Sequence, residues 1–420
     1  MRSASDIPDS IDNRKVVRRP NLLYVMKTFP SLYQGTVLSE ISVLRSVGYP
    51  VHVLSLDRPQ DMNYAAAEAL DGLITYGLDL REKSYPAVLG ANLALISRIG
   101  LAAYLDLWAL VQRFGVMGNV RGFMRLAAAA CTLRRQGFTH LHAHWADRAT
   151  EMAMILSRLS GLPFSFTCHA VDIFVSPRYL EEKLRAARFV VTVSGYNKQY
   201  LMSHYGSDLE DKIGVIYPLV DIHEFTPRLL LRTDEINILS VGRLVEKKGY
   251  SYAIEAAGLL KERGYRFVWR IVGEGRDRPH LEAVVKDLGL SGWVQLLGKL
   301  PQDDIKSLLD QSTVFALSSV VASDGDREGM PRVLIEAMAK EVPVVATDSV
   351  GISELVKDGS GLLVPPSDSV ALADAVEQII TLDWESRRVM GQTGRQIVEH
   401  EFDSDYLANK LIALFEAQSD

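Results

Sequence analysis

The chain has 420 residues and a net charge of −6, with 48% hydrophobic and 23% charged side chains. This composition excludes a disordered chain, a collagen-like repeat and a strongly basic nucleic-acid binder, and the length suggests about two domains. Two cysteines, Cys131 and Cys168, are too few for a disulfide framework and fit a reducing compartment. Residues 1–20 contain no apolar signal-peptide core, so we expect a flexible tail there and a cytoplasmic protein.

Predicted strands and helices alternate from residue 21 onward. The apolar run 21–27 predicts a buried strand, the spacing over 36–47 a helix, and the run 51–56 a second strand. This order begins a parallel sheet. Further strands are predicted at 141–144, 164–168, 189–193, 213–217, 237–241, 267–272, 294–297, 314–317, 342–347 and 361–364. So many strands favour an α/β protein with two Rossmann-like doubly wound domains, joined by a linker at 221–234.

The segment 84–135 differs from its surroundings in composition. Its charges are six arginines and one acid, Asp106, and the residues between them are mostly apolar. The longest uncharged run, 84–97, is shorter than the ~20 residues that a membrane span needs. We expect either a basic amphipathic surface that rests on anionic lipid or a pair of core helices whose arginines reach solvent.

The segment REGMPRVLIEAMA is a candidate site for phosphate or sugar oxygens. Pro331 is expected as the first residue of a helix, which places Glu328 and Gly329 at its positive N-terminal end. Glu336 is a lone carboxylate in an apolar run, and a buried carboxylate needs partners such as sugar hydroxyls. The structural alternative is an ion pair between Glu336 and Lys340.

The segment VGRLVEKKG directly follows a predicted strand, where open α/β sheets bind ligands. Gly242 allows the backbone to approach a ligand closely. Arg243 and Lys248 are suited to a diphosphate, the first by forked hydrogen bonds and the second as a point charge. The structural alternative is a solvated loop neutralised by Glu246.

The segment IVGEGR is a strand that ends in a Gly-x-Gly turn at Gly273 and Gly275. It is an incomplete dinucleotide fingerprint, and we interpret it as a tight turn that lets the chain approach a nucleotide. The sequence contains no Gly-x-Ser-x-Gly elbow, P-loop or kinase motif set, and no metal-carboxylate motif at a strand end.

Histidines mark two strand ends in the first half. His140, His142 and His144 alternate along one strand and therefore point to one side, a pattern that can bind metal. No further His or Cys completes a ligand set nearby, so we expect no metal. His169 ends another strand and precedes Asp172, and this pair is suited to hold a substrate hydroxyl. The structural alternative is a helix-capping Asp172 beside a structural His169.

Taken in order, these segments resemble a retaining glycosyltransferase of family 4 with the GT-B fold. The matching pieces are TFP…GTVLSEI, HAHW, FSFTCHAVDIF, VVTVSGYN, VGRLVEKKG, IVGEGR, EGMPRVLIEAMA and GLLVPPSD. The first-half pieces resemble the subgroup that builds bacterial exopolysaccharides such as colanic acid. The resemblance implies an acceptor-binding domain at 21–225, a nucleotide-sugar-binding domain at 226–400, and a helix at 401–420 that crosses back to the first domain.

The resemblance also assigns roles to the candidate residues. Donor contacts would come from Arg243 and Lys248 (diphosphate), Glu336 (ribose), Glu328 with the amides of Gly329 and Met330 (hexose), Gly273 and Gly275 (base), and Gly35 and Gly242 (close approach to the diphosphate). His169 would contact the sugar near its reacting carbon, with His144 and Asp172 on the acceptor side. The catalytic group would then comprise His169, Glu328, Arg243 and Lys248.

The implied reaction transfers a hexose to a glycan acceptor, expected to be lipid-linked, with retained configuration and no metal or cofactor. UDP-hexose is the favoured donor, and GDP-mannose is the next. The alternatives are a nucleotide-sugar epimerase on the same fold and a non-catalytic homologue that supports another transferase. No nucleic acid partner is expected, and contact with the inner face of the membrane follows if 84–135 rests on lipid.

Overall fold

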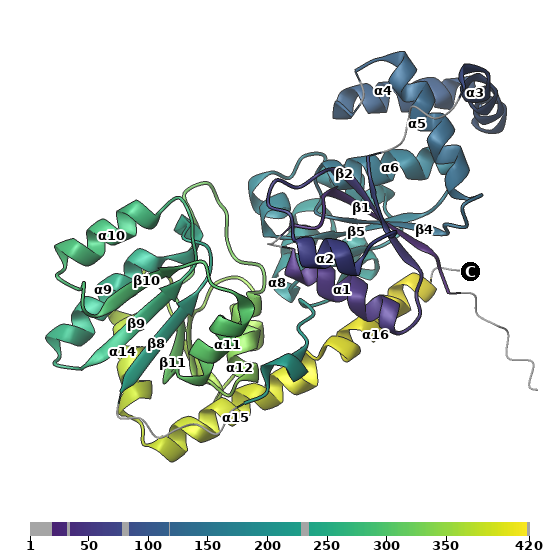
Figure 1. Ribbon diagram of the computed structural model, residues 1–420. Helices are drawn as coiled ribbons and strands as arrows, with labels where there is room; N and C mark the ends of the chain where they lie inside the picture. The colour runs from purple at the N-terminus through teal and green to yellow at the C-terminus, as the bar shows by residue number, and fades with distance from the viewer. Residues whose placement is uncertain (1–18, 32–33, 78–83, 117, 228–234, 418–420) are drawn as a thin grey trace, which may run out of the picture.

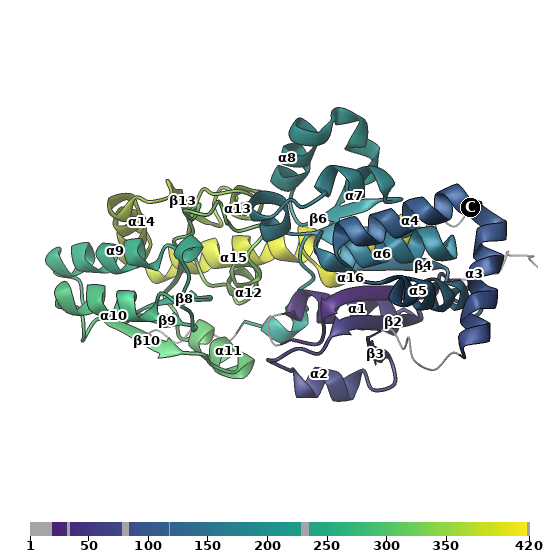
Figure 2. The ribbon, with the colours of Figure 1, turned by 90° about the horizontal axis from the view of Figure 1, so that it is seen from above.

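The computed structural model describes residues 19–31, 34–77, 84–116, 118–227 and 235–417. They form two parallel sheets, one from each half of the chain, which lie in two domains side by side (Figures 1 and 2). The predicted α/β class with two doubly wound domains is therefore confirmed. Nearly all of the predicted tail and part of the predicted linker lie outside the described residues.

The first sheet is seven-stranded, with the order β3-β2-β1-β4-β5-β6-β7 and every neighbouring pair parallel. Its strands are β1 (Leu22–Thr28), β2 (Val51–Asp57), β3 (Ile74–Tyr76), β4 (His140–His144), β5 (Phe164–Cys168), β6 (Val190–Thr192) and β7 (Ile213–Val215). The strand order reverses between β1 and β4. In open parallel sheets a ligand crevice opens at the carboxyl ends of such a pair.

The helices of the first domain cover both faces of this sheet (Figure 2). They are α1 (Gly35–Ser46), α2 (Tyr64–Ala69), α3 (Tyr85–Ile99), α4 (Leu101–Phe114), α5 (Val120–Leu133), α6 (Arg148–Ser160), α7 (Leu180–Ala186) and α8 (Gly195–Tyr205), with short helical turns η1 (Val171–Val175), η2 (Ser207–Lys212) and η3 (Ile222–Phe225).

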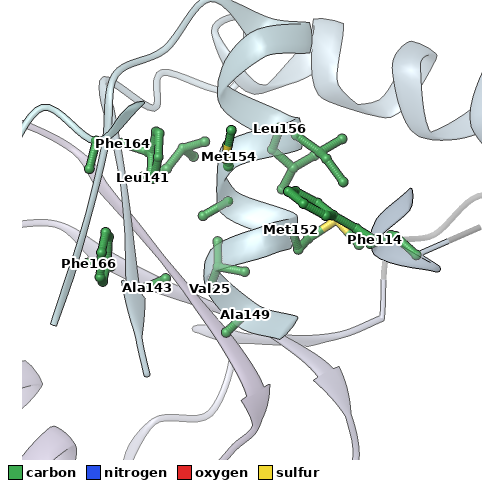
Figure 3. Packing of buried hydrophobic residues seen from close by; sticks show 14 of the residues in the cluster. Val25, Phe114, Leu141, Ala143, Ala149, Met152, Met154, Leu156, Phe164 and Phe166 are labelled. Atoms are coloured by element: carbon green, nitrogen blue, oxygen red, sulfur yellow. The ribbon is translucent and has the colours of Figure 1, made fainter. Parts of the chain in front are cut away.

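The segment 84–135 forms three helices, α3 to α5, and not the pair that the core alternative assumed. We call them the helical lobe, which projects beyond α6 (Figure 1). One side of the lobe is core, because Phe114 of α4 packs with Met152 and Leu156 of α6 (Figure 3). Among the described residues no single helix is long and apolar enough to cross a membrane; α3 and α4 pass that test only together, across a bend of 114°.

The second sheet has six parallel strands in the order β10-β9-β8-β11-β12-β13. They are β8 (Ile236–Val241), β9 (Phe267–Val272), β10 (Val294–Gly298), β11 (Val314–Leu317), β12 (Val344–Thr347) and β13 (Gly361–Val364). The helices around it are η4 (Glu246–Lys248), α9 (Tyr250–Glu262), α10 (Arg278–Asp287), α11 (Gln302–Asp310), α12 (Arg332–Ala339), α13 (Ile352–Leu355), α14 (Ser369–Thr381) and α15 (Trp384–Glu401). Here the order reverses between β8 and β11, which makes the end of β8 a second candidate ligand site.

The chain crosses between the domains twice at one place. On the way out, Phe225 of η3 already packs in a core cluster of the second domain. On the way back, the last helix, α16 (Ser404–Glu416), buries Leu411 and Phe415 in the core beside the first sheet (Figure 1). A bridge between Val220 and Asp403 ties the two crossings together. The two domains are therefore joined by a short double connection.

Each strand predicted from the sequence is present, with ends shifted by at most two residues. Strand β3 was not predicted; it has three residues at the sheet edge, none of them fully buried. Such a short, partly exposed segment shows no hydrophobic period.

Candidate functional site

A pocket of about 190 Å³ lies where the carboxyl ends of the two sheets face each other, and we call it the interdomain pocket. The residues that line it include Thr36, Trp145 and His169 from the first domain and Arg243, Lys247, Gly329 and Met330 from the second. Of the predicted site residues, it therefore brings together His169, Arg243, Gly329 and Met330.

A cluster of charges stands beside this pocket in the second domain. Lys248 Nζ lies 3.3 Å from Glu328 Oε1, and Lys247 Nζ lies 3.9 Å from the same oxygen and 3.0 Å from Asp326 Oδ1. Burial alone would raise the pKa of Glu328, but Lys248, Lys247 and Arg243 outweigh it and lower that pKa. Glu328 is therefore a carboxylate held among three cations.

The solvated-loop alternative for VGRLVEKKG is wrong. Glu246 accepts hydrogen bonds from the amide and hydroxyl of Ser323, at 2.8 and 2.7 Å, and pairs with no neighbouring cation in the described chain. The short turn of η4 buries both Lys247 and Lys248. Lys247 was not among the predicted site residues, because the sequence does not show which of two adjacent lysines points inward.

Two buried polar atoms next to the pocket have no well-directed hydrogen bond within the described residues. They are the hydroxyl of Tyr250 and Oε1 of Glu328. Buried polar groups are nearly always satisfied by protein, water or a ligand. Neither residue lines the interdomain pocket, and Glu328 Oε1 has Lys248 at 3.3 Å, so these atoms do not by themselves indicate a ligand.

The predicted glycine turn packs directly on the loop that carries Arg243. A Cβ on Gly273 would lie 1.9 Å from the Gly242 carbonyl oxygen, and one on Gly275 would lie 2.1 Å from the Leu244 carbonyl oxygen. A Cβ on Gly242 would in turn lie 2.8 Å from the Tyr250 hydroxyl. Within the described structure these glycines support the Arg243 loop by backbone contact, and their predicted contacts with a nucleotide stay predictions.

On the helix α12, Glu336 does not form the ion pair with Lys340 that was its structural alternative. Pro331 is the residue before the helix and not its first residue, so that prediction was wrong by one position. Glu336 is buried, which raises its pKa, and its ion-pair partner is Arg332, at 3.6 Å. The proposed pair with Lys340 does not form, because Lys340 Nζ bonds to Asp310 at 2.8 Å.

Gly35, the first residue of α1, meets α12 across the domain boundary. A Cβ on Gly35 would lie 3.0 Å from Arg332 Nη1, and the same guanidinium lies 3.5 Å from Ser39 Oγ. Glu336 and Gly35 are thus both neighbours of Arg332, but neither lines the interdomain pocket. Their predicted donor contacts stay predictions.

His169 is the end of a buried chain of hydrogen bonds. Its Nε2 lies 3.4 Å from His144 Nδ1, His144 Nε2 lies 3.0 Å from Glu40 Oε1, and the Tyr24 hydroxyl donates to the same oxygen at 2.6 Å. We call these four residues the histidine relay. The Trp145 ring lies over His169, with centroids 4.9 Å apart.

Burial keeps the His169 ring neutral, and the histidine relay bears on which ring nitrogen carries its one proton. Burial lowers the pKa of His169 to about 3, so its ring is neutral and carries one proton. In the arrangement where the Glu40 carboxylate accepts from Nε2–H of a neutral His144 ring, His144 Nδ1 accepts from His169 Nε2–H. The free Nδ1 of His169 is left as an acceptor for a ligand hydroxyl. Tyr24 and Glu40 were missed because only the sheet and α1 bring them to His144.

The other strand histidines belong to the same buried region. His140 Nε2 and His142 Nδ1 both lie 2.7 Å from the Ser165 hydroxyl, so they do share one side of β4 as predicted. Glu40, His142 and His144 are close enough for their ligand atoms to hold a metal ion. Their nitrogens and oxygens already bond to one another or to neighbours, so we interpret the group as a hydrogen-bond network.

Asp172 is not the helix cap that its structural alternative assumed, because it lies inside η1, whose N-cap is Ala170. Its carboxylate accepts from the amides of His169, at 2.8 Å, and Ala146, and burial raises its pKa to about 7. It also borders a second cavity in the first domain. His144 lines neither cavity and contacts His169, which lines the interdomain pocket, so its predicted role on the acceptor side stays a prediction.

Comparison with known families identifies both halves of the chain. Residues 36–224 match the family model described as Glycosyltransferase Family 4, and residues 221–397 match the one described as Glycosyl transferases group 1. The boundary between the two matches falls at η3, where the chain enters the second domain.

Two curated relatives are named for exopolysaccharide biosynthesis. WcaL of Escherichia coli K12, named for colanic acid, is 40% identical over 209 residues, which are 49% of this chain and 52% of WcaL. AmsK of Erwinia amylovora, named for amylovoran, is 45% identical over 139 residues, 33% of this chain and 34% of AmsK. The chain thus spans about half the length, or less, of these relatives.

Solved structures share the fold across nearly the whole chain. HepE of Anabaena, in complex with UDP, has a TM-score of 0.70 at 18% identity and covers 94% of this chain and 100% of its own. A glycosyltransferase of Rickettsia africae also reaches 0.70 at 18% identity, with 95% and 98% covered. The predicted GT-B fold is therefore confirmed.

Proposed function

The chain belongs to the glycosyltransferases, because its first half matches the family 4 model and its second half the group 1 model. We propose that it transfers a hexose from a nucleotide-sugar to a glycan acceptor in surface polysaccharide assembly. The observation that carries this proposal is the interdomain pocket. Arg243 and Lys247 line it from one domain, His169 lines it from the other, and Lys248 and Glu328 stand beside it. Cations for a diphosphate and polar acceptors for a sugar thus meet at one place.

The cations would act on the leaving group. When the glycosidic bond to the diphosphate breaks, negative charge grows on the phosphate oxygens, and preorganised cations lower the energy of that state. Arg243 would form a forked contact, and Lys247 and Lys248 would act as point charges. Binding of the diphosphate would replace part of their present interaction with Glu328 and Asp326.

The sugar would lie between Glu328 and His169. Glu328 is held ionised by its lysines and would accept hydrogen bonds from hexose hydroxyls, while His169 Nδ1 would accept one more from the opposite domain. We propose that the configuration is retained and that a phosphate oxygen of the leaving group takes the acceptor proton, because no side chain is assigned as nucleophile. Closure of the two domains would exclude water and align the reactants.

UDP-hexose is our first choice of donor and GDP-mannose the second. The choice of UDP is supported by HepE, a neighbour in fold that was solved with UDP and with UDP-glucose. We also propose that turnover needs no divalent metal, because the three cations supply the positive charge that a leaving diphosphate requires. Undiminished turnover in EDTA tests this.

The helical lobe is proposed to rest on an anionic lipid surface, where a lipid-linked acceptor would be presented. Tyr85, Leu89 and Leu93 follow each other at four-residue spacing along α3 and are 67, 42 and 58% exposed. Arg121 and Arg125 are exposed on α5. Exposed aliphatic and basic side chains of this kind bind membrane interfaces.

Co-sedimentation with phosphatidylglycerol vesicles tests the lipid contact. We expect the wild type to bind these vesicles better than phosphatidylcholine vesicles, and Leu89→Glu with Leu93→Glu to abolish the binding. Val389→Glu, at an equally exposed valine on α15, is the matched control. Equal binding of wild type and the Leu89/Leu93 variant would remove the lobe from the proposal.

Thermal-shift measurements with UDP, GDP, ADP and their sugars, without metal, test the donor site first. A ligand at about 100 times its dissociation constant should stabilise the protein by roughly 2.7 kcal/mol. Release of free sugar during donor turnover would support a transferase, whereas an isomerised nucleotide-sugar would support the epimerase alternative. No stabilisation by any nucleotide would favour the non-catalytic alternative.

A further inference from the structure

A cavity of about 430 Å³ in the first domain adjoins the interdomain pocket, and the two share Trp145 and Val171. We propose that it binds an anionic acceptor, a glycan that carries a phosphate or a carboxylate beside the sugar that receives the hexose. This inference rests on the proposed transferase function, because it assigns the acceptor class to the same site. The volume is in the range of pockets that hold small ligands.

Three exposed cations border this cavity from three different elements. Lys27 lies near the end of β1, Arg148 is the first residue of α6, and Arg178 follows η1. Lys27 and Arg148 form no ion pair with any residue that the structure describes. Arg178 donates from Nη2 to the Phe114 carbonyl at 3.0 Å, and its Nε lies 3.4 Å from Glu151. Arg148 is thus unpaired and Arg178 partly paired, while the charge of Lys27 acts on Asp147, where it opposes the burial that raises the pKa of that carboxyl.

The three carboxylates at the cavity are already engaged within the protein. Asp147 accepts from the Ala149 amide at 2.8 Å as the N-cap of α6. Glu151 is buried and pairs with Lys183 at 3.3 Å. Asp172 is buried and accepts from two backbone amides. Because these acids have partners of their own, the cations that border the opening are left to bind an external oxyanion.

Trp145 connects the anion position to the reaction centre. Its backbone is in the left-handed region, with φ of 67°, which is unusual for a bulky side chain. The conformation is held by a hydrogen bond from its amide to Thr167 at 2.8 Å and one to its carbonyl from the Thr150 hydroxyl at 2.6 Å. Such strain is kept where it positions a functional group. Here it places the indole over His169 and at the wall shared by both cavities.

The arrangement defines the bound orientation. An acceptor sugar would stack on Trp145, with its reacting hydroxyl toward His169 and the donor. Its charged group would extend to Lys27, Arg148 and Arg178. A phosphate of a lipid diphosphate linker and the carboxylate of a uronic acid satisfy this chemistry equally, so the experiment must separate them.

Direct binding of three probes to the full chain tests the proposal. Methyl glucoside is neutral, glucose 1-phosphate carries a phosphate on C1, and methyl glucuronide carries a carboxylate at C6. Ligand-observed NMR is run on the wild-type chain with an excess of UDP, so that the probes do not occupy the donor cations. We expect at least one charged probe to bind about fivefold more tightly than methyl glucoside for each cation that contacts it, the size of a partly exposed ion pair.

Lys27→Gln and Arg148→Gln should each remove about one such factor from the charged probe and leave methyl glucoside unchanged. Arg158→Gln is the matched control, since Arg158 is also an exposed arginine of α6 but pairs with Glu182 at 3.8 Å. Preference for glucose 1-phosphate or for methyl glucuronide supports the proposal and identifies the source of the charge.

Equal binding of charged and neutral probes, or no binding at tens of millimolar, overturns the anionic acceptor. So does a charge preference that both variants keep. The proposed function is checked separately, by stabilisation of the wild type with nucleotides. Failure of that measurement alone would remove the donor assignment and leave the anion site standing.

Discussion

The second domain builds its part of the site from two short segments, while the first domain builds its part from residues far apart in the chain. Arg243, Lys247 and Lys248 come from one loop after β8, and Glu328 comes from the loop before α12. The histidine relay instead joins β1, α1, β4 and the residue after β5. Charge is thus gathered locally, whereas the orientation of one neutral ring depends on the whole first sheet.

Acidification should have the largest effect, because it lowers the stability of the first domain more than that of the second. Burial lowers the pKa of His140 and His169 to about 3 and also lowers that of His142. These histidines take up protons near pH 6.5 in the unfolded chain but only near pH 3 in the folded one. The folded state therefore loses stability relative to the unfolded state as pH falls from 6.5 toward 3. Asp172 opposes this, because its raised pKa makes the folded state bind a proton between about pH 4 and 7.

At pH 5 His140 and His169 each cost about 2 kcal/mol, His142 adds to this loss, and Asp172 returns about 2 kcal/mol, so the first domain should lose at least about 2 kcal/mol between pH 7 and pH 5. Urea unfolding at both pH values, with hydrogen exchange to identify the domain, measures this. His280→Gln, at an exposed histidine of the second domain, is the control and should leave the loss unchanged. Earlier unfolding of the second domain would contradict the comparison.

Lys248→Ala should lower turnover about a hundredfold, or about 3 kcal/mol, because it removes charge from the leaving diphosphate and leaves buried Glu328 with one close cation fewer. Steady-state kinetics with the donor identified by thermal shift provide the measurement. Lys286→Ala, at an exposed lysine of α10, is the control. Unchanged turnover would remove Lys248 from the proposed catalytic group.

Glu40→Gln should lower kcat about tenfold and leave UDP affinity unchanged. A glutamine amide can donate to His144 as well as accept from it, so the tautomer of His169 is no longer set. Tyr24→Phe keeps the contact between Glu40 and His144, and we expect a smaller loss. Equal losses in the two variants, or a weakened UDP affinity, would indicate that the relay only stabilises the fold.

Glu354→Gln should have the smallest effect, about 1 kcal/mol in the free energy of unfolding. Glu354 of α13 accepts from the amides of Gly195 and Tyr196 at the start of α8, both at 2.8 Å, and so joins the second domain to the first. The loss reflects one charge at a helix N-terminus. Urea unfolding measures it, with Glu399→Gln on α15 as a control; an equal loss in both would show that the domain contact contributes nothing.

The second-domain site was predictable to the extent that its residues are contiguous in sequence. The loop VGRLVEKKG and the segment around Glu328 each combine glycine, charge and a strand or helix end, and the fold brings them together as expected. Lys247 shows the limit of that approach. Whether Lys247 points to solvent or inward depends on the backbone conformation of η4, which the neighbouring residues in the sequence do not specify.

The sequence by itself determined the alternation of strands and helices, the α/β class and the loop for which diphosphate binding is proposed, because period and local charge are properties of short segments. Only the tertiary structure decided that Glu40 and Tyr24 stand behind His169 and that Lys27, Arg148 and Arg178 border one cavity. These contacts join residues up to about 150 positions apart, and such pairs meet only when the sheet order and register are set.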